Sequence, residues 1–300
     1  MHRFLRTVGF REYQKKHDIR HLIRELTACA EPGQIRRLNL DGETNLCEVR
    51  VETAPDMGLA IYGEMDENGE IDPEYYVPYV TGREGSSDAE CSFQRHTDRE
   101  TCAGMLDEFK VGISLIFYLD NIMDLREKML AGESVETDYV SLNGLASTGK
   151  ILLPVRKTSA QREKARVAAA ERDQLLEAAR KGDEEAMETL TVEDIDLYAQ
   201  VSRRVMKEDI YSVVETCFMP AGVECDQYQI IGDITRIDRE QNRFTGEGIY
   251  RFGIACNHMH FDVVINEKDL LGEPKVGRRF KGQIWMMGTA YFRGHSDIRS

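Results

Sequence analysis

Residues 158–181 read TSAQREKARVAAAERDQLLEAARK, and this run separates two unlike parts of the chain. Thr158 and Gln161 have the spacing of a helix capping box, and the alanine, glutamate and arginine residues that follow have high helix propensity. Gly182 is expected to end this helix. A short helix over residues 183–190 and another that opens at Thr191 come next. Residues 156–214 are therefore predicted to form a charged helical connector.

The two halves of this connector differ in charge and in apolar content. Residues 156–181 carry eight basic and four acidic side chains, whereas residues 182–200 carry seven acidic and no basic ones. This polarity favours antiparallel pairing, within the chain or between two chains; two independently solvated helices are the alternative. The earlier helix has few large apolar residues, which is typical of a solvated or partner-facing helix. The later helix has an apolar face at helical spacing, made of Ile195, Tyr198, Val201 and Val205.

Before the connector, residues 1–155 are expected to form an acidic domain of mixed helices and strands. A helix is predicted from Asp18, where apolar residues follow at helical spacing, and Pro32-Gly33 ends it. Another helix is predicted over 121–130. Strand patterns cover most of the remainder, and few of them alternate with helices as a doubly wound sheet requires. The predicted strands are 45–53, 58–65, 75–81, 111–119 and 150–155.

After the connector, residues 215–300 return to strand patterns. Short apolar runs separated by turns, with one longer connection over 266–277, predict a small β-barrel that is OB-like or SH3-like. The expected strands are 228–237, 243–256, 259–265 and 279–287. The predicted class is thus α+β, with a mixed N-terminal domain, a helical connector and a C-terminal barrel.

Composition excludes several classes of protein. The chain has 300 residues, a 41% hydrophobic share and only seven prolines, which rules out collagen-like, mucin-like and globally disordered chains. The formal charge of −14 disfavours a general polyanion binder. This charge is uneven, because residues 38–155 sum to −16 and residues 215–300 to −1. The argument against nucleic acid therefore holds for the N-terminal region and weakens for the barrel.

The cysteines and the apolar runs indicate a cytoplasmic protein. Seven scattered cysteines without a C-x-x-C pair are typical of reduced thiols, not of a disulfide framework or a structural zinc site. The first residues lack the apolar core of a signal peptide. The longest apolar run, residues 111–119, is too short to span a membrane.

The best candidate for a metal site is Cys256-Asn257-His258-Met259-His260. On a continuous strand, Cys256, His258 and His260 would project from one face and could ligate a transition metal, with Asp262 as a fourth ligand. A hairpin turn at Asn257 is the alternative, and it would scatter these side chains.

A second candidate is the run from Val276 to Trp285, in which basic and aromatic residues alternate. Arg278, Arg279, Lys281 and Trp285 could form a platform for single-stranded nucleic acid on a barrel. The favoured alternative is that Trp285, together with Phe280 and Ile284, fills the core while the arginines lie outside.

Three other motifs are interpreted as structural. Residues 144–150 fit the G-x-x-x-x-G-K frame of a phosphate-binding loop, but Ile151 replaces the required Ser or Thr and a strand follows, so a hairpin turn is predicted. The acidic tract 64–74 lacks the calcium-loop register and is expected to be a solvated hairpin loop. Cys225 has no nucleophile motif around it and is expected to be buried at the start of a strand.

Three segments resemble an uncharacterised bacterial family that is classed as a domain of unknown function. They are residues 1–10 (MHRFLRTVGF), residues 222–228 (GVECDQY) and residues 277–288. The resemblance extends over the whole chain and implies a bacterial, cytoplasmic setting. It implies no activity, cofactor or site residue.

We therefore expect a cytoplasmic binding or regulatory module that acts through protein contacts or self-association, with the connector and barrel meeting a partner or a second copy. One alternative is a small-molecule hydrolase or transferase with a site at the interface of the two β-rich domains. Another is nucleic-acid binding through the barrel. Neither a membrane contact nor a defined cofactor is indicated.

Overall fold

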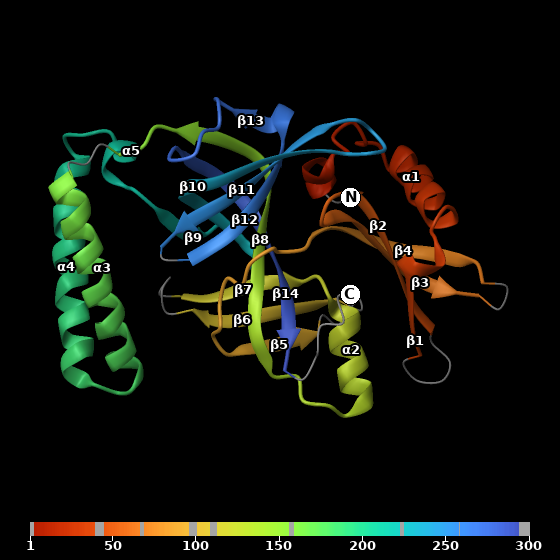
Figure 1. Ribbon diagram of the computed structural model, residues 1–300, viewed down its shortest axis with the longest axis horizontal. Helices are drawn as coiled ribbons and strands as arrows, with labels where there is room; N and C mark the ends of the chain where they lie inside the picture. Colours follow the sequence, from red (N-terminus) through yellow and green to blue (C-terminus); the bar gives the residue numbers. More distant parts are fainter. Residues whose placement is uncertain are drawn as a thin grey trace.

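The computed structural model describes residues 3–39, 45–66, 69–95, 101–108, 113–155, 159–222, 225–257 and 259–293. These residues combine helices with two β-sheets, so the predicted α+β class is confirmed. Figure 1 shows a smaller sheet with its helix at one edge, a larger sheet in the centre and a pair of long helices at the opposite edge. No helix in the described ranges is both long and apolar enough to cross a membrane.

The smaller sheet is antiparallel and is built from residues near the N-terminus. Helix α1 (Lys16–Ala28) contacts it through β4 and buries one apolar stripe, as its sequence spacing predicts. Helix α2 (Ile122–Ala131) lies against β1, where Arg36 pairs with Asp124 at 2.7 Å. The strands, in spatial order, are β1 (Ile35–Asn39), β2 (Asn45–Ala54), β3 (Met57–Met65) and β4 (Ile71–Val80).

The larger sheet combines strands from both β-rich regions. In order along it lie β13, β8, β12, β11, β10, β14, β7, β6 and β5, with β9 paired to β10. From the first region come β5 (Cys91–Arg95), β6 (Cys102–Glu108), β7 (Ile113–Leu119) and β8 (Thr137–Leu152). From the second come β9 (Cys217–Pro220), β10 (Gln227–Gln241), β11 (Gly248–Cys256), β12 (Met259–Asn266), β13 (Leu270–Leu271) and β14 (Arg279–Phe292).

The pairing of β8 joins the two β-rich regions of the chain. This strand runs antiparallel to β14 along almost its full length and parallel to β12 at residues 143–146. Strand β7 also pairs with β14. Strands from residues 91–152 and from residues 217–292 therefore share one sheet, and an independent OB-like or SH3-like barrel of residues 215–300 is not confirmed.

Strand β8 also corrects the hairpin predicted over residues 144–150, because the strand continues through them without a turn. Glycines are required here for close packing against β14. A Cβ at Gly144 would lie 2.7 Å from Ile284, and one at Gly149 would lie 2.4 Å from the Phe280 ring. The glycines that resemble a phosphate loop thus make room for side chains of the neighbouring strand.

The connector forms two long antiparallel helices, α3 (Ser159–Arg180) and α4 (Glu184–Val205), which we call the arm. Gly182 adopts a positive φ of 88° between the two helices. The Asp183 side chain caps α4 by accepting hydrogen bonds from the backbone N–H groups of Glu185 and Ala186. The helix break predicted before Thr191 does not occur, since its hydroxyl bonds back to Met187 O at 2.8 Å within one continuous helix. Short helix α5 (Ile210–Val213) leads back to the sheet, and Figure 1 shows the arm at the edge of the molecule.

The N-terminal segment joins the two sheets. Its 3₁₀ helix η1 (Arg3–Val8) contacts β3 and β4 of the smaller sheet and β8 and β12 of the larger one. Phe4 stacks on Trp285 with ring centroids 5.3 Å apart, and Asn242 Nδ2 donates to Val8 O at 2.7 Å. Two further 3₁₀ turns are η2 (Pro32–Gln34) and η3 (Glu267–Asp269).

Candidate functional site

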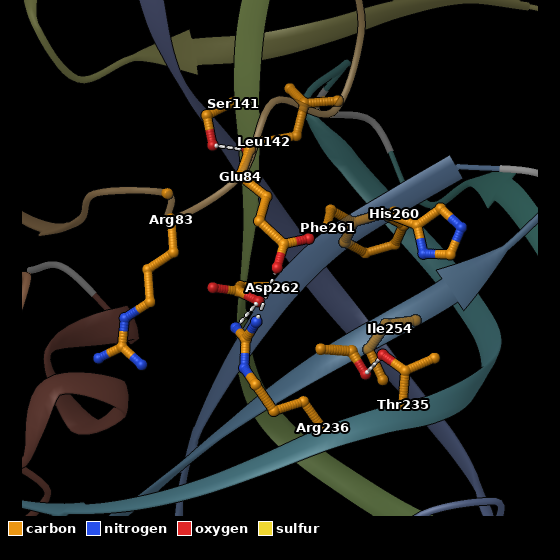
Figure 2. Close-up of a pocket in the computed structure, with 12 residues that line it drawn as sticks. Arg83, Glu84, Ser141, Leu142, Thr235, Arg236, Ile254, His260, Phe261 and Asp262 are labelled. Atoms are coloured by element: carbon orange, nitrogen blue, oxygen red, sulfur yellow. Dashed lines mark hydrogen bonds and ion pairs between the residues drawn. The ribbon is translucent and has the colours of Figure 1, made fainter.

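A polar cleft opens between β8, β10, β11 and β12 and has a volume of about 350 Å³ (Figure 2). Arg236 and Asp262 lie at its centre, and His260 stands exposed at its rim. Its wall is formed by Gly82, Arg83, Glu84, Ser141, Leu142, Thr235, Arg236, Gly253, Ile254, His260, Phe261 and Asp262.

The charged groups of this cleft neutralise one another. Arg236 donates from its three nitrogens to Asp238, Glu84 and Asp262, at 3.1, 3.2 and 2.7 Å. Asp262 also accepts from Arg251, a fully buried arginine, at 2.7 Å. Every nitrogen of Arg236 already donates to a carboxylate. This guanidinium therefore has little capacity left to bind an anionic ligand in the cleft.

Two of the three metal-site candidates, Cys256 and His260, do not share a face. Cys256 pairs across the β11–β12 hairpin with Met259, and His260 pairs with Ala255, so Cys256 and His260 project from opposite faces. The turn at Asn257, with a φ of 47°, is the predicted alternative, and it breaks the continuous strand that a metal site needs. The Cys256 thiol lies 3.2 Å from the carbonyl oxygens of Cys217 and Ile231, and burial raises its pKa to about 12. His258 lies outside the described residues.

Two of the nucleic-acid candidates are buried in protein contacts. Trp285 is 6% exposed and donates from Nε1 to Asp226 at 2.6 Å, as the core interpretation predicts. Arg279 is buried as well, which the sequence interpretation did not foresee, and burial lowers its pKa. Lys281 hydrogen-bonds Tyr211 and lies 4.4 Å from its ring centroid, and Arg278 donates to Glu273 O at 2.7 Å. Arg279 and Trp285 are thus unavailable for stacking on bases.

Arg279 holds the two ends of the arm segment together. Before α3, Leu153 O accepts from Arg279 Nε and Nη2 at 3.0 and 2.7 Å. After α4, Tyr211 O and Val214 O accept at 2.6 and 2.7 Å. One side chain of β14 therefore fixes where the arm leaves the sheet and where it returns. Sequence reasoning missed this role, because its partners are backbone groups far away in the chain.

A cluster of buried polar groups lies where the two sheets meet, and we call it the interface cluster. Arg50 Nη2 donates to Asp120 O at 2.7 Å, and Glu48 accepts from Tyr62 Oη at 2.7 Å. Asp120 is 1% exposed, and neither of its carboxylate oxygens has a well-formed hydrogen bond within the described residues. Desolvation raises the Asp120 pKa to about 6, against the opposing effects of Arg50 and Thr289. This cluster was not predicted.

The remaining sequence motifs have structural positions. Strands β3 and β4 form a hairpin, and Asp66 in its loop accepts a hydrogen bond from Glu70 N at 2.7 Å. The acidic tract thus lies in a hairpin as predicted, although residues 64–65 and 71–74 belong to its strands and residues 67–68 lie outside the described residues. Cys225 is exposed, which corrects the expectation that it is buried.

The outer side of the arm is apolar. On α4, Val192, Ile195 and Tyr198 are 54%, 63% and 76% exposed, and Met206, at the C-cap of this helix, is 85% exposed. The opposite side of this helix contacts α3, where Arg172 pairs with Asp194 at 2.8 Å.

Comparison with protein families matches residues 5–288 to a family described as "Domain of unknown function, E. rectale Gene description (DUF3881)". The match covers all but the ends of the chain, so the resemblance inferred from the three sequence segments is confirmed. No curated protein and no solved structure matches the chain.

Proposed function

We propose that this chain, which belongs to the DUF3881 family, is a protein-binding module that docks through its arm. The observation that carries the proposal is the exposed apolar surface of α4. A soluble chain rarely leaves several large apolar side chains in one row exposed unless another surface covers them. We place this module in the cytoplasm, on the basis of its odd number of scattered cysteines.

Helix α4 has two apolar sides, and among the described residues only one of them has a partner. Towards α3 lie Ala186, which is buried, and Leu190 and Val201, which are half-buried. On the opposite side, Val192, Ile195 and Met206 follow helical spacing and are all more than half exposed. Packing within the hairpin therefore accounts for the first side and leaves the second uncovered.

The attachment of the arm supports a docking role. Arg279 bonds the chain on both sides of the arm, and Lys281 holds Tyr211 in α5. An element held at both ends presents its outer side in a defined orientation, which lowers the entropic cost of binding. The alternative of a hydrolase or transferase needs a site at the interface of the two β-rich regions. In the cleft between β8 and β10–β12, the central charges of Arg236 and Asp262 already pair with one another.

Photo-crosslinking in living cells tests this proposal. A photoreactive amino acid at position 198 is expected to give a discrete crosslinked protein band. The matched control is position 197, because Leu197 is the next residue, is 57% exposed and projects from a different side of α4. No band from position 198, or equal bands from both positions, would contradict docking through this surface.

A further inference from the structure

We infer that the occupant of the outer side of α4 is a second copy of this chain, with the two α4 helices packed antiparallel. This inference rests on the proposed docking role of the arm and names its partner. Three features support it: the heptad spacing of the apolar residues, the unequal charge of the two halves of α4, and the positions of two flanking charges.

The apolar residues follow the spacing of a short coiled-coil seam. Val192, Ile195, Ala199 and Met206 occupy heptad positions a and d, and the remaining d position between them is the small polar residue Ser202. Tyr198 and Val205 flank this seam. A seam packs best against another helix with the same spacing, and a second α4 supplies one. Such a contact is isologous, because the same surface serves both copies.

The charge of α4 selects the antiparallel arrangement. Within α4, residues 184–196 carry six acidic and no basic side chains, whereas residues 197–205 carry two basic and no acidic ones. Two antiparallel copies place the acidic half of each helix against the basic half of the other. Two parallel copies would place acidic halves together, and like charges across a helix pair are unfavourable.

One flanking pair makes this arrangement specific. Asp196 and Arg203 are seven residues apart and occupy the same heptad position, e, beside the seam. In antiparallel helices related by a two-fold axis, e positions face e positions. Asp196 of one copy therefore lies opposite Arg203 of the other, and the symmetry produces this pair twice. Within the chain, Arg172 of α3 pairs with Glu193 and Asp194 on the side of α4 that faces α3. The side with Asp196 and Arg203 is the one that would face the second copy.

A single pair of helices buries an area at the low end of stable interfaces, so we expect association in the micromolar range that is lost on dilution. Sedimentation velocity of the full chain over a range of concentrations should show a monomer–dimer equilibrium. Ile195→Lys places a charge in the seam and should abolish the dimer. Leu197→Lys, which adds the same charge on another side of the helix, should leave it intact.

Charge reversal then tests the antiparallel pairing. Asp196→Arg alone and Arg203→Asp alone each place like charges at both symmetric contacts, and each should weaken the dimer about tenfold or more. Mixing the two variants restores opposite charges at both contacts and should give a heterodimer by native mass spectrometry. Since a misfolded variant would not be rescued by mixing, this rescue separates pairing from folding.

The outcomes distinguish this inference from the proposed function. A wild-type chain that stays monomeric at every concentration, or a dimer that is insensitive to Ile195→Lys, would overturn the second copy as the occupant. A crosslink from position 198 to a different protein would then keep the docking role and change its partner. With neither dimer nor crosslink, both proposals fail.

Discussion

Replacing Asp120 with Asn should stabilise the protein at neutral pH. Asp120 lies at the end of β7, where the two sheets meet, and is 1% exposed. Its carboxylate oxygens lack well-formed hydrogen bonds among the described groups, and the nearest cation is Arg50, whose Nη2 lies 3.8 Å from Oδ2. Glu48 on β2 and Asp124 on α2 add negative charge nearby, whereas Thr289 on β14 favours the charged form. An amide has the same shape and carries no charge to bury.

The size of the effect follows from the pKa. Burial raises the Asp120 pKa from 3.8 to about 6, so the folded state binds this proton more tightly than the unfolded state. The contribution to stability is complete below the unfolded value and is lost as pH rises through the folded value. At about 1.4 kcal/mol per pH unit, the full difference amounts to about 3 kcal/mol. Asp120→Asn removes this loss. Because pH 4 already lies slightly above the unfolded pKa, the advantage of the variant over the wild type should grow by somewhat less than the full amount, about 2 kcal/mol, between pH 4 and pH 7.5.

Urea unfolding of both proteins at several pH values measures this difference, because the other titrating groups are common to both. The same substitution at Asp88, an exposed residue between β4 and β5, is the control for loss of one negative charge. A stability difference that does not change between pH 4 and pH 7.5 would refute the reasoning. So would an Asp120→Asn protein that is less stable than the wild type at pH 7.5.

Three further substitutions test other parts of the structure. Arg279→Gln removes donors at both ends of the arm segment, and hydrogen exchange of residues 211–215 should become faster; unchanged exchange would argue against the anchoring role. Asp262→Asn leaves buried Arg251 without its carboxylate and should cost about 3–5 kcal/mol in urea unfolding, whereas Glu84→Gln, at a 73% exposed side chain, should cost less than about 1 kcal/mol. Gly149→Ala places a Cβ 2.4 Å from a ring of β14 and should lower stability by about 1–3 kcal/mol; a wild-type melting temperature would contradict this packing.

The helices could be predicted from the sequence because their signals are local. Helix α1 shows its apolar spacing directly, and the arm shows helix formers ended by Gly182. The sheet pairing could not be predicted in the same way, because strand patterns do not specify their partners. The glycines of residues 144–150 predict a turn that would divide β8 into two strands. In the structure they allow close contact with β14 within one continuous strand.

The same distinction between local and long-range signals applies to the candidate sites. The turn at Asn257 was foreseen as an alternative, and it separates Cys256 from His260. Burial of Trp285 was favoured because a lone tryptophan among apolar neighbours usually packs inside. Asp120 gave no signal, since its burial depends on two sheets that meet only in the folded chain. The prediction that Arg279 lies outside the core was wrong for the same reason. Backbone carbonyl groups of Leu153 and Tyr211, far away in the chain, accept its hydrogen bonds.

Oxidation of methionines tests directly whether the outer side of α4 is covered. Met206 lies on this side and is 85% exposed, whereas Met219 lies on β9 and is 52% exposed. Dilute peroxide followed by mass spectrometry reports the oxidation of each residue without any substitution. In an undiluted cell extract, Met206 should be protected relative to Met219, and dilution of the purified chain should remove this protection. Faster oxidation of Met206 than of Met219 under both conditions would contradict the docking role of the arm.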